Sequence, residues 1–291
     1  MTLRIRVPGE LQSCRESGPE YPGGVFLVDK PAGPTSFAMV RALRRVLGLK
    51  KVGHAGTLDP FASGLLVLCA GRSATKMISS FMEGEKEYLA TLCLGVETTT
   101  LDPEGEVISR CPVGRLQAGE IEQVLSRFRG RQMQTPPAFS ALKHKGKPLY
   151  HYARKGISII KEPREIVILQ LERVDDSGDL AGDECLLHLR IVCSKGTYIR
   201  SLAADIGRSL GCGAYLTELR RVRSGCFSVA GSLDGELLLG NMGREQALNA
   251  ALSLEQACNL LQLSGKSDNV AIRSTDHDDD FSPGGRHLAL G

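Results

Sequence analysis

A short, continuously apolar run places the strongest constraint on the fold of this chain. Residues 65–70 read Leu-Leu-Val-Leu-Cys-Ala, and Gly64 and Gly71 bound them. A strand that is apolar at every position, and not only at alternate positions, is typical of a sheet covered on both faces. We therefore expect this segment to be a strand with other elements packed on either side.

The rest of the chain predicts strands and helices in irregular alternation. Apolar or alternating segments predict strands at residues 25–28, 86–96, 166–171 and 186–193, and helical spacing predicts helices at residues 36–47, 121–128 and 199–210. Further helices are expected at residues 148–155, which Pro148 opens, and at residues 244–251 and 254–261. Ser36 and Gly48 are the expected caps of the first helix, and the polar residues 132–147 are expected to form a long loop. Because no regular strand–helix–strand repeat emerges, the sequence predicts an α+β fold with a mixed sheet that carries helices.

Composition excludes several kinds of protein. No apolar run approaches the roughly 18 residues of a membrane span, and the N-terminus has no signal-peptide core, so we expect a cytoplasmic protein without a membrane partner. The nine cysteines form no CxxC pair and the histidines are dispersed, which argues against a disulfide framework and a metal site. No Gly-Lys-Ser/Thr follows the glycine-rich residues 53–64, so a phosphate-binding loop is not indicated.

Basic residues gather in four short clusters. Residues 1–252 hold 33 basic and 27 acidic side chains, whereas residues 253–291 hold three and six. The clusters fall at residues 41–51, 127–131, 143–147 and 220–223. They suit a nucleic-acid phosphate backbone, with a solvated surface as the alternative for each cluster by itself.

Residues 53–64 form the most unusual segment, Gly-His-Ala-Gly-Thr-Leu-Asp-Pro-Phe-Ala-Ser-Gly, in which Asp59 precedes Pro60. An isolated Asp-Pro pair usually marks a turn. The whole string, however, resembles the catalytic loop of the TruB family of tRNA pseudouridine synthases. Four more segments resemble further motifs of that family in the family's order, at residues 30–36, 86–88, 136–150 and 193–202, so the resemblance runs from about residue 25 to residue 227.

The resemblance implies a fold and a domain organisation. It predicts the pseudouridine synthase fold, a mixed and mainly antiparallel sheet with flanking helices, in a catalytic domain at residues 24–252. An RNA-gripping thumb loop is expected as an insertion at about residues 132–164. Residues 1–23 are expected to be a flexible extension, and residues 253–291 a short tail or a truncated remnant of the PUA module that relatives carry.

The resemblance also implies an activity, the isomerisation of uridine 55 in the T-loop of tRNA to pseudouridine after the base has been flipped out of its stack. The bond between ribose C1′ and uracil N1 is cleaved, the base rotates, and it rejoins through C5. Nothing enters or leaves, so no cofactor is expected. The expected partner is the T-arm of tRNA, and we expect a monomer without an obligate protein partner.

Asp59, Tyr88 and Arg200 are the catalytic residues that the resemblance implies. The Asp59 carboxylate attacks uracil C6 or ribose C1′, or helps to remove a ribose proton, and the sequence does not choose among these routes. Because a desolvated carboxylate resists ionisation, Arg200 is expected to pair with it. Tyr88 is expected to stack on the uracil and to assist removal of the C5 proton.

The resemblance further implies a set of RNA-binding residues, with no metal ligand among them. His54 is expected to fill the space that the extruded bases leave, and Tyr198 and Leu202 to line the uracil pocket. The remaining candidates are glycines of the catalytic loop and cations that contact phosphates: Gly53, Gly56, Lys30, Arg41, Lys143, Lys147 and Arg220. Where the family usually has Thr-Asp-Thr before a second aspartate, this chain has three threonines before Asp102, so we assign no role to Thr99.

Two other functions remain open from the sequence. One is a noncatalytic RNA-binding or RNA-folding protein on the same scaffold, since a fold does not fix an activity. The other is a metal- or nucleotide-dependent hydrolase, which the missing phosphate-loop lysine and the dispersed ligand residues disfavour. Turnover in EDTA without nucleotide is the observation that separates the isomerase from both.

Overall fold

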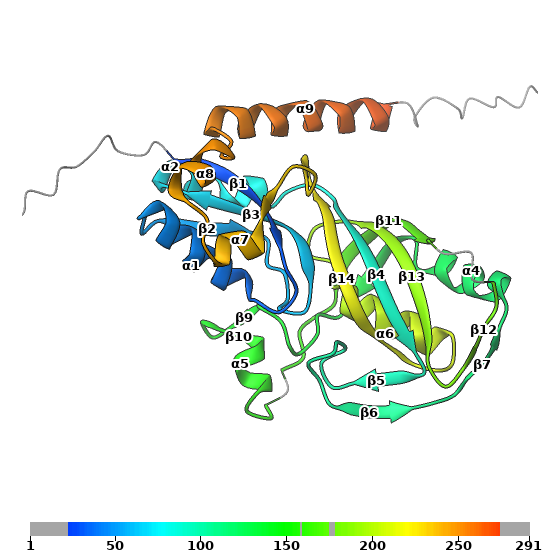
Figure 1. Cartoon of the computed structure of the whole chain (residues 1–291). Helices are drawn as coiled ribbons and strands as arrows, with labels where there is room; N and C mark the ends of the chain where they lie inside the picture. Colours follow the sequence, from blue (N-terminus) through cyan, green and yellow to red (C-terminus); the bar gives the residue numbers. More distant parts are fainter. Residues whose placement is uncertain (1–22, 158, 175–177, 274–291) are drawn as a thin grey trace, which may run out of the picture.

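The computed structural model describes residues 23–157, 159–174 and 178–273, and a ten-stranded sheet forms its centre (Figure 1). The main path of the sheet contains, in spatial order, β16 (Leu233–Asp234), β1 (Gly24–Lys30), β3 (Ser63–Ala70), β14 (Ala214–Ser224), β4 (Lys86–Leu94), β13 (Cys185–Cys193), β11 (Arg164–Arg173) and β8 (Gly130–Gln134). Beside this path, β2 (Val52–Ala55) pairs with β3, and β15 (Phe227–Ser228) pairs with β14. β1 and β16 are parallel, as are β3 and β14, and the other pairs are antiparallel, which confirms the predicted mixed sheet and the α+β fold.

Helices and three small two-stranded sheets surround this sheet. The helices are α1 (Ser36–Leu47), α2 (Arg72–Lys76), α3 (Ile78–Phe81), α4 (Ala118–Arg127), α5 (Leu149–Ala153), α6 (Ile199–Ser209), α7 (Gly235–Leu239), α8 (Arg244–Asn249) and α9 (Leu254–Arg273). The small sheets pair β5 (Val96–Thr98) with β6 (Val107–Arg110), β7 (Val113–Leu116) with β12 (Leu180–Gly182), and β9 (Lys143–His144) with β10 (Lys147–Pro148). In Figure 1, α1, α7 and α8 lie at the β1–β3 end of the sheet, α6 lies beside β14 and β4 in the middle, and α4 lies at the β11 end.

Strand β3 is covered on both faces, as its apolar run predicts. Its alternate residues enter the main core, which α1 shares, and a second cluster, which α2, α3 and α9 share. All of residues 65–70 are 0% exposed. Gly64 has a φ of 98°, and a Cβ there would lie 2.3 Å from the carbonyl oxygen of Arg221, so glycine is what lets β3 approach β14 this closely.

The strands β14, β4, β13 and β11 carry helices on one face. α6 packs on β14 and β4, and α4 packs on β11. Tyr88 and Ala90 of β4 are buried on the side of α6, whereas Leu89 and Leu186, on the opposite face, are 41% and 50% exposed. The packing against β4 and β14 fixes the position of α6, whose first turn contributes to the candidate site.

The first helix is capped by a different residue from the one predicted. The Thr35 hydroxyl accepts the Ala38 N–H at 3.1 Å, because Thr35 is the residue with extended backbone just before the helix. The buried Ser36 hydroxyl instead bonds the carbonyl oxygen and the N–H of Leu58, at 2.8 and 2.9 Å. Gly48 ends α1 with a φ of 69°, as predicted.

Besides short elements that the sequence did not predict, such as β2, α2, α3 and α7, three segments depart from the predicted pattern. Residues 132–134 belong to β8 and the β9–β10 hairpin follows, so residues 132–147 are a loop only in part, although α5 begins after Pro148 as expected. The pattern does not predict β14, because arginines at 220, 221 and 223 interrupt its apolar alternation. α9 continues to Arg273 instead of ending near residue 261.

The predicted N-terminal extension lies almost wholly outside the described residues, as does the chain beyond residue 273. Leu252 forms a β-bridge with Val25, and Ala257 of α9 is buried in the second cluster, so the start of the predicted tail packs on the catalytic domain. The division at residue 252 stays a prediction. Within the described residues, no helix is long and apolar enough to cross a membrane.

Candidate active site

Asp59 lies in the loop between β2 and β3, and neighbouring segments hold this loop through its backbone. The Ser36 hydroxyl bonds both backbone groups of Leu58. The buried Lys30 ammonium donates a hydrogen bond to the Pro60 carbonyl oxygen at 3.1 Å. The residues on each side of Asp59 are therefore fixed, which limits the positions its carboxylate can take.

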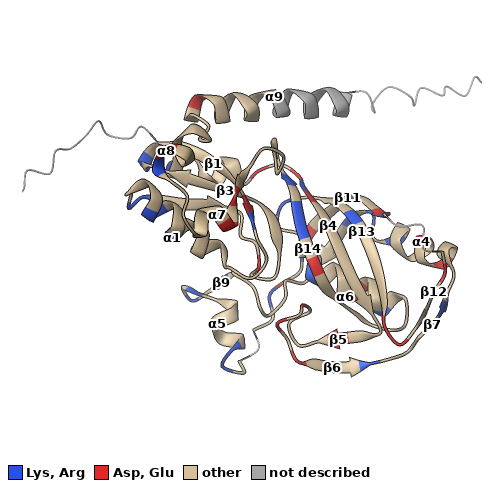
Figure 2. Cartoon of the chain, in the orientation of Figure 1, with Lys and Arg blue, Asp and Glu red and all other residues tan. Residues whose placement is uncertain are grey.

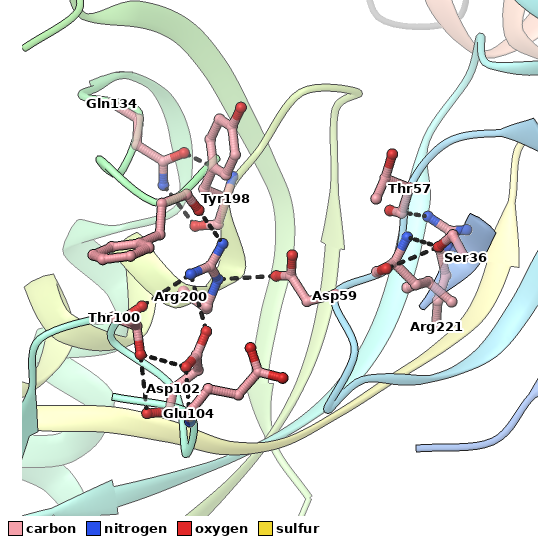
Figure 3. A network of polar contacts seen from close by, with 12 residues as sticks. Ser36, Thr57, Asp59, Thr100, Asp102, Glu104, Gln134, Tyr198, Arg200 and Arg221 are labelled. Carbon is pink, nitrogen blue, oxygen red and sulfur yellow. Dashed lines mark hydrogen bonds and ion pairs between the residues drawn. The ribbon is translucent and has the colours of Figure 1, made fainter. Parts of the chain in front are cut away.

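Arg200, in the first turn of α6, brings two carboxylates and two carbonyls together (Figure 3). Its Nε lies 2.9 Å from Oδ2 of Asp59, and its Nη1 lies 3.0 Å from Oδ2 of Asp102. Nη1 also donates to the Thr100 carbonyl at 2.9 Å, and Nη2 donates to the Phe139 carbonyl at 2.7 Å. The guanidinium is 5% exposed and held on three sides, so its direction toward Asp59 is fixed.

The surroundings of Asp59 have opposing effects on its pKa. Burial raises the pKa of Asp59, and the neighbouring Asp102 carboxylate raises it further. The Arg200 guanidinium and the Lys30 ammonium lower the pKa of Asp59, without cancelling the effect of burial. A carboxylate that is poorly solvated but paired with a cation is suited to nucleophilic or base catalysis.

Two cavities meet at the pair formed by Asp59 and Arg200. The first has a volume of about 320 Å³ and is lined, besides the pair, by Lys86, Tyr88, Tyr198, Ile199, Leu219 and Arg221. The second has a volume of about 430 Å³ and is lined, besides the pair, by Phe37, His54, Glu104, Phe139, Tyr150 and Arg154. Both volumes fall within the roughly 300–1,000 Å³ of ordinary ligand sites, and the Asp59 side chain, 37% exposed, borders both.

Tyr88 of β4 forms the aromatic wall of the first cavity and is 8% exposed. Burial raises the pKa of Tyr88, and the nearby Arg221 guanidinium acts in the opposite direction. Burial also raises the pKa of Tyr198, at the other side of the same cavity. Both phenols therefore stay neutral near pH 7 and offer a ring face and a hydroxyl to a ligand.

Residues 44–199 match the family described as TruB family pseudouridylate synthase (N terminal domain). The chain belongs to the TruB family. Residues 200–254 match the description tRNA pseudouridylate synthase B C-terminal domain, so the two matches together include Asp59, Tyr88 and Arg200, whereas β1 precedes them.

Proteins named tRNA pseudouridine synthase B are close relatives of this TruB family member. One, from Desulfotalea psychrophila, is 59% identical over 84% of this chain and 98% of its own length. Another, from Chlamydia pneumoniae, is 46% identical over 75% of this chain and 90% of its own length.

Two solved structures share the pseudouridine synthase fold. A Cbf5-Nop10-Gar1 complex matches with a TM-score of 0.54 and 31% identity over 74% of this chain. An H/ACA RNP bound to a substrate RNA containing 2′-deoxyuridine matches with a TM-score of 0.56 and 28% identity over 80% of this chain. The TruB chain described here spans 53% and 60% of those two chains.

Several of the residues predicted for this TruB protein meet at the site. The expected ion pair between Asp59 and Arg200 is present, and Tyr88 and Tyr198 line one cavity beside it. His54 lines the other cavity, although it lies in strand β2 and not in a loop. Burial lowers the pKa of His54, and its Nδ1 atom is buried without a hydrogen-bond partner.

The structure contradicts the predicted role of Lys30. This residue is 0% exposed, and its ammonium donates to the carbonyl oxygens of Pro31, Pro34 and Pro60. Burial lowers the pKa of Lys30 to about 8. The hydrogen bonds of Lys30 therefore hold the loop beside Asp59 in place, and its ammonium is not accessible to a phosphate.

Leu202 and Gly53 also have packing roles. Leu202 is 1% exposed, lies in the main core and borders neither cavity, so its prediction as a pocket residue is wrong. At Gly53, a Cβ would lie 2.8 Å from Cδ1 of Ile78, so a larger residue there would have to displace the end of the Ile78 side chain. Gly56 has a φ of 90° and lies against the Arg221 guanidinium.

The remaining predicted cations lie in different surroundings. Lys143 and Lys147 are exposed on the β9–β10 hairpin, and Arg41 is exposed on α1, where Figure 2 also shows basic residues. Arg220 forms two contacts with Asp29, at 2.9 and 2.6 Å, so it already has an anionic partner. The three exposed cations keep their predicted role as candidate phosphate contacts.

The sequence did not predict roles for Asp102 and Arg221, which surround Asp59 and Arg200, or for Gln134, which bonds the backbone of Tyr198. Asp102 is 3% exposed and pairs with Arg200. Arg221 is 2% exposed and donates from Nε to the Leu65 carbonyl at 2.8 Å and from Nη2 to the Gly56 carbonyl at 3.1 Å, so it holds both ends of the Asp59 loop. Residues 214, 216, 219 and 221 are the inward-facing positions, but the register shift between 216 and 218 breaks their alternation, so the sequence gives no signal that identifies Arg221.

Proposed function

We propose that this protein isomerises uridine 55 in the T-loop of tRNA to pseudouridine, with Asp59 as the reacting carboxylate. The observation that carries the proposal is the Asp59–Arg200 pair at 2.9 Å, fixed where two cavities meet. Membership of the TruB family and the names of the relatives support the choice of tRNA as substrate.

The first cavity suits a uracil that has left its stack. Tyr88 supplies a ring face for the base, and Tyr198 lines the same space. Once the bond between C1′ and N1 is broken, the detached uracil must stay enclosed while it rotates. The second cavity, which His54 borders, then takes the RNA next to the target nucleotide.

The reaction needs a carboxylate that is ionised in a poorly solvated site. Arg200 supplies the countercharge for Asp59, and its other bonds hold it in place before the substrate arrives. Asp59 then acts on uracil C6, on ribose C1′ or on a ribose proton, and Tyr88 assists removal of the proton from C5. The balance of the reaction needs no redox or group-transfer cofactor.

We also propose that a monomer acts on the T-arm, in the cytoplasm, without an obligate protein partner. Asp59, Tyr88 and Arg200 lie together within a single chain, which supports a site that needs no residue from a second subunit. The exposed lysines at 143 and 147 lie on the thumb, where they are available to the RNA backbone.

The test is to incubate the wild type and Asp59→Asn with T-arm RNA in EDTA without nucleotide. Pseudouridine is mapped with a chemical adduct that blocks reverse transcription. We expect a block at position 55 with the wild type and none with Asp59→Asn, although the variant still binds the RNA. Asp205→Asn is the matched control, because Asp205 of α6 pairs only at the surface with Arg208 and should leave activity intact.

Undiminished isomerisation by Asp59→Asn would contradict the mechanism. RNA binding by the wild type without any product would favour the noncatalytic RNA-binding protein.

A further inference from the structure

Gln134, at the end of β8, forms two hydrogen bonds with the backbone of Tyr198 through its side-chain amide. Its Nε2 donates to the Tyr198 carbonyl at 3.0 Å, and its Oε1 accepts the Tyr198 N–H at 2.8 Å (Figure 3). The residue is 5% exposed. Such a two-point contact reproduces the pairing that a strand would make and fixes the backbone of Tyr198 in position and direction.

Tyr198 is the N-cap residue of α6, and Arg200 lies two residues further on. The side chain of Tyr198 makes no capping bond, so the contact with Gln134 is what holds the start of this helix against β8. A shift of this turn would move the Arg200 guanidinium away from Asp59. The 2.9 Å contact between the two leaves little tolerance for such a shift.

The segment that follows Gln134 touches the same turn a second time. The Phe139 carbonyl accepts Nη2 of Arg200 at 2.7 Å. Pro136 and Pro137 lie between the two contacts, and their fixed φ angles stiffen the connection. Residues 134–139 therefore contact the start of α6 at both of their ends.

Residues 134–139 also form the start of the expected thumb (residues 132–164), and we call them the thumb root. The Tyr150 N–H donates to the Ser140 carbonyl at 3.1 Å, and the Leu149 N–H donates to the Leu142 carbonyl at 2.8 Å, so α5 is hydrogen-bonded to the residues that directly follow Phe139. The position of the thumb is thereby coupled to that of Arg200.

We infer that Gln134 is a positioning residue for the isomerisation, which sets the place of Arg200 relative to Asp59 and makes correct placement of the thumb root part of active-site assembly. The inference rests on the proposed function. Gln134 touches neither cavity, so it acts on the reaction only through Tyr198 and Arg200.

The experiment compares Gln134→Met with Gln132→Met. Methionine keeps the length of the side chain and removes its hydrogen bonds. Gln132 lies in the same strand, but its amide donates to the Phe128 carbonyl at 2.6 Å and not to the start of α6, so it is the matched control. For both variants, kcat, KM for T-arm RNA, the pH profile of kcat/KM and the unfolding midpoint are measured.

We expect Gln134→Met to lower kcat by about 10- to 100-fold, the range for a displacement of about 1 Å in an active site, with KM little changed. The acid limb of kcat/KM should move to higher pH, because a displaced guanidinium stabilises the ionised Asp59 less well. Gln132→Met should change neither. Gln134→Asn, which keeps the amide on a side chain one methylene shorter, should give an intermediate loss and serves if Gln134→Met does not fold.

A folded Gln134→Met with the wild-type kcat, or with an unmoved acid limb beside a lower unfolding midpoint, would overturn the inference and leave Gln134 a purely structural residue. Failure of the proposed function looks different. In that case the wild type itself makes no pseudouridine.

Discussion

Replacing Arg200 by alanine separates the stabilising role of this residue from its catalytic role. The Asp102 side chain is 4% exposed, so in this variant it remains buried without the guanidinium that now contacts it at 3.0 Å. Removing one partner of a buried ion pair costs about 3–5 kcal/mol. At about 2–4 °C per kcal/mol for a domain of this size, the unfolding midpoint should fall by roughly 6–20 °C.

A second substitution identifies the source of that loss. Asn at position 102 keeps an oxygen that can accept the Thr100 hydroxyl and the Glu104 N–H, and it removes the negative charge. The double variant Arg200→Ala/Asp102→Asn should therefore recover about half or more of the lost stability, since the loss comes from an uncompensated buried charge. It should remain inactive, because Asp59 still lacks its cation.

The assay is thermal unfolding followed by circular dichroism, together with pseudouridine formation on T-arm RNA. Arg208→Ala is the control, because Arg208 lies in the same helix and pairs with Asp205 at the surface, where a pair contributes about 1 kcal/mol or less. A double variant no more stable than Arg200→Ala would refute the reasoning from buried charge.

Four further variants test the roles of single side chains at the site and on the β9–β10 hairpin. Asp102→Asn alone should move the acid limb of kcat/KM to lower pH, because the Asp102 carboxylate raises the pKa of Asp59, which must be ionised; a single-turnover pH profile that stays in place or moves upward contradicts this. Tyr88→Phe should lower turnover about 100-fold or more if its hydroxyl assists proton transfer, whereas near-normal turnover would limit Tyr88 to stacking. Lys147→Met should reduce the slope of log affinity against log salt by about 0.7–0.9, as expected for one phosphate contact. Lys30→Met should leave that slope unchanged and lower the unfolding midpoint instead, and equal slope changes in the two variants would contradict the assignment of Lys30 to the loop.

Local patterns predicted several of the helices and the long strands except β14, and they missed most of the short elements. The run at residues 65–70 predicted β3 and its coverage on both faces, and α1, α4 and α6 form where helical spacing predicts them. Prediction failed at β14, where three arginines occupy a central strand. Strand propensity and alternation describe an average environment, and they do not anticipate an arginine such as Arg221 whose donors are met by buried carbonyls.

The chain's own order of residues was sufficient to single out Asp59, its glycine-spaced loop, and the arginine expected to face it. These features are local, or belong to motifs whose order along the chain is itself informative. Only the tertiary structure decided what Lys30, Asp102, Gln134 and Arg221 do. The role of a charged or polar side chain depends on which groups from distant segments surround it and on whether water reaches it, and both are set by the packing of β14, β8 and α6 around the Asp59 loop.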